Sequence, residues 1–363
     1  MATPLAGMKV VELARILAGP WAGQVLADLG AEVVKVESPQ GDDTRRWGPP
    51  FVGEDAAYFH ATNRGKRSVV ADFATEEGRA LVLDLVHDAD VLIENFKLGG
   101  LARFGLDYDS LQAINPRLVY CSITGFGHDG PYASRAGYDF IVQGMSGIMD
   151  LTGDPRGPPQ KIGVAYADIL TGLYAVIAIQ AALHQREATG RGQHIDMALF
   201  DVMTGTLANQ AMNYLVSGVS PTRLGNAHPN IAPYEAFPVA DGWVIVAVGN
   251  DTQFQRLCDV LDVPLDQKWW SNAGRVRDRV ALSQAISAQT RDWERDALLA
   301  ALEEQGIPAG PINTVAQALA DPQIAARGMV LDLGEGLKGL RTPIHFSDAE
   351  LAPGKRSPKL GEG

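Results

Sequence analysis

Short β-rich runs alternate with helical segments in the N-terminal part of the chain, and this alternation restricts the fold more than any other feature. A strand pattern over Met8–Ala14 is followed by the helical stretch Trp21–Gly30 and by a second strand pattern that ends at Glu37. Further apolar strands are indicated near residues 88–96 and 117–127. Such alternation is typical of a mostly parallel sheet covered by helices. The sequence therefore predicts an α/β protein with a large Rossmann-like domain.

The segment between the first two strands lacks the phosphate-binding fingerprint of dinucleotide-binding domains. It reads RILAGPWAGQ rather than GxGxxG, and Pro20 removes one of the backbone N–H donors that a pyrophosphate would need. Glu37 does stand where an acidic partner for a ribose lies in such domains. Without the glycine fingerprint, we expect neither a nicotinamide nor a flavin cofactor.

A change in composition near Ser217 indicates a second domain. The residues after it are rich in turn formers, and PYEAFPVADGWVIVAVG is typical of two strands joined by a turn at Ala240–Gly242. We place a smaller α/β domain over residues 225–320.

The large domain is expected over residues 1–215, and the C-terminal segment 325–363 is expected to return to it. The stretches at about 190–225 and 320–345 are interpreted as linkers. Two domains also agree with the usual ~150 residues per domain.

Acidic residues outnumber basic residues by 43 to 31, which gives a formal net charge of −12 at pH 7. A general binder of nucleic acid or anionic membrane is therefore not expected, and any anionic ligand must be bound by a local basic cluster. Cys121 and Cys258 have no CxxC or Cys/His spacing, which argues against a disulfide scaffold and against a metal site. Both are expected to be buried, reduced thiols.

Two further features bear on where the protein works. The N-terminus does not show the basic, apolar and small-residue order of a signal peptide, so a cytoplasmic setting is expected. The most apolar stretch, Ile169–Leu183, is shorter than the ~20 residues that span a bilayer, and it contains Gln180. It is interpreted as a buried helix, and no membrane partner is expected.

Asp168 falls in the first turn of a long helix predicted from Tyr166 to about Glu187. A carboxylate there faces the unpaired N–H groups and partial positive charge of a helix N-terminus, which are expected to keep it ionised and available as a nucleophile. The alternative is a helix-capping aspartate, the commoner role for an Asp before an apolar helix. The residues alone leave both interpretations open.

Several short sequences occur in order along the chain: ILAGP, VVKVESPQGDDTR, NRGKRSV, ADVLIENF, YCSITGFGHDGP, RAGYDF, the segment around Asp168, and GIPAGPINT. Together they resemble the class III CoA-transferases from Leu5 to Gly361, and the resemblance rests on the collinear set rather than on one motif. In that family a carboxylate at the position of Asp168 attacks an acyl-CoA thioester, and an acyl-aspartyl anhydride and an aspartyl-CoA thioester follow. The resemblance implies the same role here.

The resemblance also implies the ligands. Coenzyme A is expected as a substrate and covalent intermediate, with no tightly bound cofactor. Members of the family form interlocked homodimers, so a homodimer is expected. The whole-length similarity is nearest to members that use succinyl-CoA with a dicarboxylic acid such as glutarate. The residues that match CoA-contacting positions are Ile16, Leu17, Val70, Asn95, Arg103 and Tyr138.

On an acidic protein the phosphates of CoA require concentrated cations. Candidate contacts for a phosphate or a carboxylate are Arg45, Arg46, Arg64, Lys66, Arg67 and Lys97. Lys97 follows a strand, where the carboxyl ends of parallel strands present ligand-binding loops. Arg45 and Arg46 follow the turn QGDD and are expected to bind the distal carboxylate of a substrate. For NRGKRSV, a solvated turn is the alternative.

Acyl transfer passes through an oxyanion, which needs backbone N–H donors and close approach of the chain. Candidates are the loop Gly125–Gly130, Gly144 with Gly147, and Gly225 with Asn226. Ordinary turns between strands explain each of these glycines equally well.

Two other functions are alternatives. Racemases of the same superfamily move a proton with a His and an Asp. Tyr138 stands at the position of that His, and a phenol with a pKa of ~10 is a poor base at neutral pH. His128, in the preceding glycine loop, is the substitute to consider. A non-catalytic acyl-CoA-binding protein would need the cationic and glycine segments but not Asp168.

Members of the family usually continue past the LGE sequence into a closing helix, whereas this chain stops at Gly363. Either a shortened chain or a missing last helix is expected from that comparison.

Overall fold

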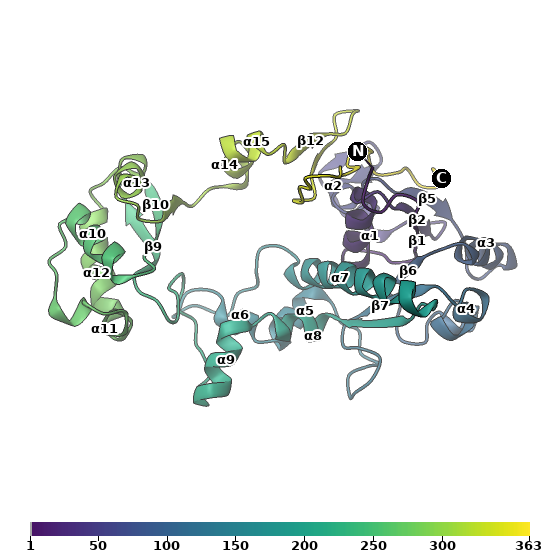
Figure 1. Ribbon diagram of the computed structural model, residues 1–363, viewed down its shortest axis with the longest axis horizontal. Helices are drawn as coiled ribbons and strands as arrows, with labels where there is room; N and C mark the ends of the chain where they lie inside the picture. Colours follow the sequence, from purple (N-terminus) through teal and green to yellow (C-terminus); the bar gives the residue numbers. More distant parts are fainter. Residues whose placement is uncertain (1) are drawn as a thin grey trace. The chain divides into compact units, whose positions relative to one another are not determined.

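A six-stranded sheet forms the centre of the larger of two units in the computed structural model, which describes residues 2–363 (Figure 1). Its strands are β1 (Lys9–Glu12), β2 (Glu32–Glu37), β5 (Arg67–Val70), β6 (Val91–Glu94), β7 (Val119–Thr124) and β8 (His194–Ala198). They lie in the order β5-β2-β1-β6-β7-β8, and each neighbouring pair is parallel. The predicted α/β fold with a mostly parallel sheet is confirmed.

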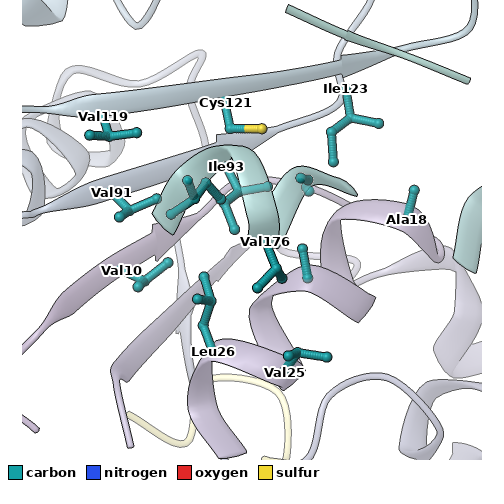
Figure 2. Packing of buried hydrophobic residues seen from close by; sticks show 14 of the residues in the cluster. Val10, Ala18, Val25, Leu26, Val91, Ile93, Val119, Cys121, Ile123 and Val176 are labelled. Carbon is teal, nitrogen blue, oxygen red and sulfur yellow. The ribbon is translucent and has the colours of Figure 1, made fainter. Parts of the chain in front are cut away.

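Helices cover both faces of this sheet because successive strand residues point to opposite faces. The helices are α1 (Ala18–Asp28), α3 (Glu76–His87), α4 (Tyr108–Ile114), α5 (Asp139–Met145), α7 (Tyr166–Thr189) and α8 (Leu199–Gly205). Val10 and Ile93 belong to one buried cluster with residues of α1 and α7. Their neighbours Val11 and Leu92 belong to a second cluster with residues of α3 and α4. Figure 2 shows the first cluster, which includes the free thiol of Cys121.

Helices α1 and α7 approach each other closely through a glycine. A Cβ atom at Gly172 would lie 2.6 Å from the carbonyl oxygen of Ala18 and 3.2 Å from the side chain of Trp21. Any larger residue would push the helices apart. This contact places the first turn of α7, with Asp168, near the start of α1.

Helix α7 is the one helix within residues 2–363 that is long and apolar enough to cross a membrane, with 24 residues. Length and composition alone are weak evidence, because the core helix of a soluble protein has the same properties. One face of α7 is buried in the first cluster through Ala175, Ile179 and Leu183. The structure therefore places α7 against the sheet as a core helix, as predicted.

The smaller unit is built on a three-stranded antiparallel sheet of β9 (Tyr234–Val239), β10 (Gly242–Ala247) and β11 (Ala309–Pro311). The hairpin predicted around Ala240–Gly242 is thus present. Helices α10 (Asp251–Leu261), α12 (Arg279–Thr290) and α13 (Arg295–Glu304) contribute to its core. Phe237, Phe254 and Leu298 are fully buried there, and Cys258 is a second buried free thiol.

The bounds of the two units differ from the predicted domains. The larger unit comprises Met1–Met149, Lys161–Gly218 and Pro322–Gly363, and the smaller comprises Asp150–Gln160 and Val219–Asp321. The segment Asp150–Gln160 was predicted in the large domain, but the Asp150 carboxylate lies 2.7 Å from the guanidinium of Arg223 in the smaller unit. This ion pair joins the segment to residues far along the chain, which local patterns do not reveal.

The predicted linkers hold regular structure. The stretch 190–225 contains β8, α8 and α9 (Ala208–Ser217), and β8 pairs with β7 at the edge of the sheet. The stretch 320–345 contains the elements α15 (Pro322–Ala326), β12 (Val330–Asp332) and β13 (Lys338–Leu340). The assignment of these stretches as linkers between the domains stays a prediction.

The remaining elements are short. They are η1 (Asp43–Arg46), β3 (Phe51–Val52), β4 (Asp55–Ala56), α2 (Ala57–His60), η2 (Ala102–Phe104), α6 (Ile148–Leu151), η3 (Gln267–Trp269), α11 (Asn272–Arg277) and α14 (Val315–Leu319).

Candidate active site

A cleft of about 470 Å³ lies in the larger unit beyond the carboxyl ends of β1, β6 and β7. The strand order reverses beside β1, which has β2 on one side and β6 on the other, and α/β sheets bind ligands at such a switch point. Among the residues that line the cleft are Arg15, Ile16, Leu17, Asn95, Lys97, Arg103, Tyr138 and Asp168. The fold thus brings together Asp168 and most of the predicted CoA contacts.

Asp168 lies in the first turn of α7 and lines this cleft. Within residues 2–363 its carboxylate accepts no hydrogen bond and pairs with no cation. Burial and the neighbouring Asp139 raise the pKa of Asp168 to about 7. The expectation that this carboxylate is fully ionised at neutral pH is therefore not met, because burial and the like charge of Asp139 both disfavour its charged form. Near neutral pH the group is poised between its two protonation states.

Asp139, the first residue of α5, provides the cap of α7. Its Oδ1 accepts hydrogen bonds from the backbone N–H groups of Ala167 (2.8 Å) and Asp168 (3.4 Å). Its Oδ2 accepts from the Gln143 amide at 2.8 Å. The alternative interpretation of Asp168 as a capping aspartate is wrong, since a different carboxylate caps the helix. Sequence reasoning missed Asp139, although it directly follows Tyr138 in the quoted RAGYDF.

The turn before α1 presents its backbone to the cleft and is held in place by Asn95. The Asn95 amide oxygen accepts from the Arg15 N–H at 2.9 Å, and its Nδ2 donates to the Arg15 carbonyl at 2.7 Å. The predicted CoA contact Asn95 therefore uses its side chain to orient the turn. Leu17 follows as the N-cap of α1, and Leu17 and Ala18 both line the cleft.

Three cations of the cleft have no carboxylate partner among the described residues: Lys97, Arg103 and Arg135. The guanidinium of Arg103 lies over the Phe104 ring, 4.4 Å from its centre, and that of Arg135 lies 4.0 Å from the centre of the Tyr132 ring. Such cations can bind anionic groups without first breaking an ion pair. Sequence reasoning missed Arg135, because it stands alone between loop residues.

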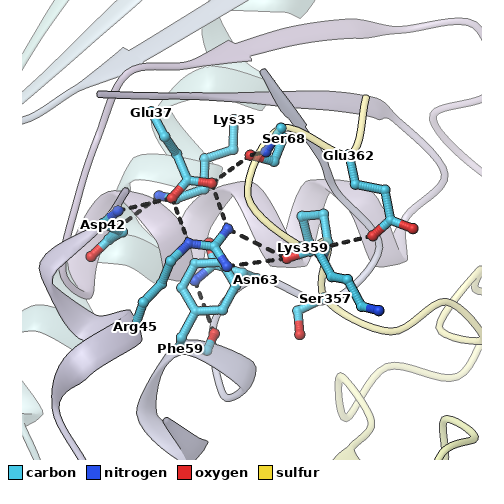
Figure 3. A network of polar contacts seen from close by, with 12 residues as sticks. Lys35, Glu37, Asp42, Arg45, Phe59, Asn63, Ser68, Ser357, Lys359 and Glu362 are labelled. Atoms are coloured by element: carbon cyan, nitrogen blue, oxygen red, sulfur yellow. Dashed lines mark hydrogen bonds and ion pairs between the residues drawn. The ribbon is translucent and has the colours of Figure 1, made fainter. Parts of the chain in front are cut away.

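Arg45 does not face the cleft, contrary to its prediction as a carboxylate contact. Its Nη2 lies 2.6 Å from Glu37, its Nη1 lies 2.8 Å from Asp55, and the guanidinium stacks on the Phe59 ring. Figure 3 shows this buried network, in which the Ser68 hydroxyl also donates to Glu37. Arg45 is committed to internal carboxylates, so it has no free donor face for a substrate.

Arg64 and Lys66 are likewise buried and paired, and the prediction that they bind phosphate is wrong. Arg64 bonds to Asp28, and Lys66 lies 2.7 Å from a carboxylate oxygen of Glu12. Burial lowers the pKa of Lys66 to about 8, against the opposing effect of Glu12. Both cations stabilise the interior of the larger unit.

Arg46, Arg67 and Val70 are exposed but do not line the cleft. The Arg46 guanidinium contacts Asp43 (3.2 Å) and donates to the carbonyl of Gln40 (2.6 Å). Arg67 and Val70 begin and end the edge strand β5. Their assignment to ligand binding stays a prediction.

The glycines separate into two groups. Gly144 lies inside α5, where its N–H belongs to the hydrogen bonding of the helix. Gly225 and Asn226 form a turn in the smaller unit, and a hydrogen bond from the Ala227 N–H to the Leu224 carbonyl closes this turn. Within the cleft, a Cβ on Gly125 would lie 2.4 Å from the Cα of Gly137. That close backbone approach requires glycine at both positions.

His128 lines a different cavity of about 250 Å³, together with Glu94, Tyr108 and His194. The centre of its ring lies 5.0 Å from that of His194, and the backbone N–H of His128 donates to the Asp196 carboxylate at 2.8 Å. His128 is therefore not the base that would partner Asp168 in a racemase. Within residues 2–363, no group of three or more His, Cys, Asp or Glu residues is arranged to bind a metal ion.

Comparison with known proteins agrees with this geometry. The model of CoA-transferase family III matches residues 5–363. A succinate–glutarate CoA-transferase from Agrobacterium fabrum is 59% identical over 99% of this chain and 93% of its own length. The human succinyl-CoA:glutarate CoA-transferase is 39% identical over 99% of this chain and 84% of its own length.

Solved structures agree as well. The crystal structure of a CAIB/BAIF family protein from Brucella suis is 65% identical and superposes with a TM-score of 0.92, covering 100% of this chain and 97% of that one. With the family model spanning nearly the whole sequence, the chain belongs to CoA-transferase family III and is a CoA-transferase.

Proposed function

We propose that this CoA-transferase moves CoA from succinyl-CoA to a dicarboxylic acid such as glutarate, with Asp168 as its covalent nucleophile. The observation that carries the assignment of Asp168 is a carboxylate without a hydrogen-bond donor or cation, within residues 2–363, in a cleft lined by unpaired cations. The relatives named for succinate and glutarate support the choice of substrates.

In the proposed reaction, the group bound to the Asp168 carboxyl changes twice, from succinyl to CoA and then from CoA to glutaryl. The ionised Asp168 attacks the thioester carbonyl of succinyl-CoA, and the C–S bond breaks to give a succinyl-aspartyl anhydride and CoA thiolate. The thiolate attacks the aspartyl carbonyl and releases succinate, which leaves an aspartyl-CoA thioester. A glutarate carboxylate attacks that thioester, and the C–S bond breaks to give a glutaryl-aspartyl anhydride and CoA thiolate. The thiolate then attacks the glutaryl carbonyl, which yields glutaryl-CoA and the free Asp168 carboxylate.

The environment of Asp168 suits this sequence. A carboxylate whose pKa is about 7 is a stronger base and nucleophile than an ordinary one, yet a substantial fraction is ionised near neutral pH. Lys97 and Arg103 are assigned to the phosphates of CoA, and the backbone of Ile16 and Leu17 to its thioester arm. Gly125 and Gly137 let two backbone segments approach closely at the edge of the cleft.

A homodimer is part of this proposal. Helix α7 leaves Tyr174 and Ile177 exposed, the latter by 63%, and α9 leaves Leu215 and Val216 exposed by 71% and 80%. Apolar side chains gathered on helices in this way are typical of surfaces covered by another protein. Light scattering on the purified protein should give twice the chain mass, and a monomer at micromolar concentration would contradict the dimer.

The substrate assignment is tested by offering succinyl-CoA with a panel of carboxylic acids and identifying new CoA thioesters by mass. We expect glutaryl-CoA, with much slower transfer to monocarboxylic acids. Preferred transfer to a monocarboxylic acid would contradict the dicarboxylate assignment.

A further inference from the structure

The turn before α1 adopts a backbone conformation that its own sequence disfavours. Ile16 has φ of 72°, in the left-handed region that β-branched residues rarely occupy. Ile16 also lines the cleft that holds Asp168. Because the conformation costs free energy, the surrounding structure must impose it.

Three sets of hydrogen bonds hold the turn. The Asn95 amide accepts a hydrogen bond from the Arg15 N–H and donates one to the Arg15 carbonyl. The Lys35 ammonium donates to the Ala14 carbonyl at 2.9 Å. The Ile16 N–H itself donates to the Asp42 carboxylate, with 3.2 Å to Oδ2 and 3.4 Å to Oδ1. Only the last contact acts on the strained residue directly.

Asp42 is well suited to hold one fixed position. It is 1% exposed, and its Oδ2 lies 2.9 Å from the Lys35 ammonium. Its Oδ1 accepts hydrogen bonds from the Thr44 N–H (3.0 Å) and hydroxyl (2.8 Å). Its own N–H donates to Glu37 at 2.8 Å, and Figure 3 shows Asp42 beside Glu37 and Lys35.

The charge of Asp42 is secure. Burial alone would raise the pKa of Asp42, but Lys35 and the Thr44 donors outweigh it and hold the pKa below its usual value. The carboxylate that accepts from the Ile16 N–H is therefore ionised at neutral pH.

We propose that Asp42 is a positioning residue of this CoA-transferase: its buried carboxylate holds Ile16 in the left-handed conformation and so sets the backbone of the turn in the cleft that contains Asp168. The proposal rests on that cleft being the place of CoA transfer. Asp42 does not line the cleft, and its effect reaches the reaction through the position of the Arg15–Leu17 backbone.

A double-mutant cycle tests this role. Asp42→Asn removes the charge and the ion pair, so the turn relaxes and kcat/KM should fall about 100-fold, the usual cost of a misplacement near 1 Å. In an Ile16→Gly background the same change should cost about threefold or less, because glycine adopts positive φ without strain. An equal loss in both backgrounds would overturn the proposal.

Two further variants keep the test decisive if Asp42→Asn does not fold. Thr44→Val keeps the shape and the Lys35 pair but removes one donor that orients Asp42, and it should lower kcat/KM about fivefold, again with the loss suppressed by Ile16→Gly. Asp28→Asn is the matched control, since Asp28 is equally buried and paired with Arg64 but lies away from the cleft. It should lower the melting temperature without changing kcat/KM of the folded protein.

The outcome is separable from the fate of the proposed nucleophile. Failure to form a covalent adduct on Asp168 in the wild-type enzyme would contradict the nucleophile alone. A normal adduct together with wild-type kcat/KM in Asp42→Asn and Thr44→Val would contradict the positioning role alone.

Discussion

Asp42 and Asp168 are two carboxylates of the same unit that are withdrawn from solvent, yet their surroundings are opposite. Asp42 lies 2.9 Å from the Lys35 ammonium and accepts hydrogen bonds from Thr44, so its pKa stays low despite burial. Asp168 is partly buried with Asp139 nearby and, within residues 2–363, with no donor, so its pKa rises to about 7. A carboxylate that is fully hydrogen-bonded and paired with a cation supports the structure. A carboxylate without a donor or a cation keeps its oxygen atoms available for reaction.

Asp168→Asn should produce the largest effect on activity. The amide keeps the shape but is a very weak nucleophile, so kcat should fall about 1,000-fold or more. Because the carboxylate has no hydrogen bond to lose, the free energy of unfolding should not fall. Steady-state kinetics and urea unfolding measure both quantities, and a variant that unfolds more easily but keeps its activity would reverse the roles of the two aspartates.

Arg45→Ala should produce the largest effect on stability. It leaves Glu37 and Asp55 without their cation in the interior, which costs about 3 to 5 kcal/mol of unfolding free energy. The matched control is Arg46→Ala, because Arg46 is exposed and should contribute about 0.5 kcal/mol or less. If Arg45→Ala instead raised only the KM for the acceptor acid, the substrate role that the sequence suggested would be restored.

The sequence predicted those parts of the molecule that depend on local patterns. The strands around Val10 and Ile93 and the hairpin at Ala240–Gly242 follow from short-range alternation, and the helix that begins at Tyr166 follows from its apolar length. The position of Asp168 in the first turn of that helix could therefore be predicted as well.

The predictions of site residues were wrong where the ion-pair or hydrogen-bond partner of a residue lies far along the chain. Arg64 stands 36 residues from its carboxylate partner Asp28, and Lys66 stands 54 residues from Glu12. In the sequence, a run of basic residues indicates an anion-binding site. In the fold, these cations are paired with carboxylates from distant parts of the chain. Asp139 was missed for the same reason, because it caps a helix 28 residues away.

Lys97→Ala and Arg103→Ala should each raise the KM for succinyl-CoA about tenfold, since each removes the charge-assisted contact that we propose with a phosphate of CoA. The increase should shrink at high salt, which screens the wild-type contact. Arg67→Ala is the control, because Arg67 is exposed but outside the cleft. Equal effects of all three changes would mean that overall charge, rather than the cleft, attracts CoA.

Asp139→Asn should have a smaller effect, seen in the pH profile. Burial is the larger cause of the raised pKa of Asp168, and the negative charge of Asp139 is the second cause. Removing the Asp139 charge should therefore lower the pKa of Asp168. The ionised nucleophile then persists to lower pH, and the acidic limb of kcat/KM should move toward lower pH. The amide oxygen can still cap α7, so stability should change by about 1 kcal/mol or less. A limb that moved to higher pH would show that Asp139 does not act on Asp168 through its charge.

The central claim, that Asp168 carries the transferred groups, is tested most directly by trapping the intermediate. Hydroxylamine added together with succinyl-CoA should inactivate the enzyme and convert the Asp168 carboxyl to a hydroxamate, seen as a mass change on the peptide that contains it. Without the thioester, hydroxylamine should do nothing, and Asp168→Asn should give no adduct. An adduct on another residue, or inactivation with no change at Asp168, would contradict the account.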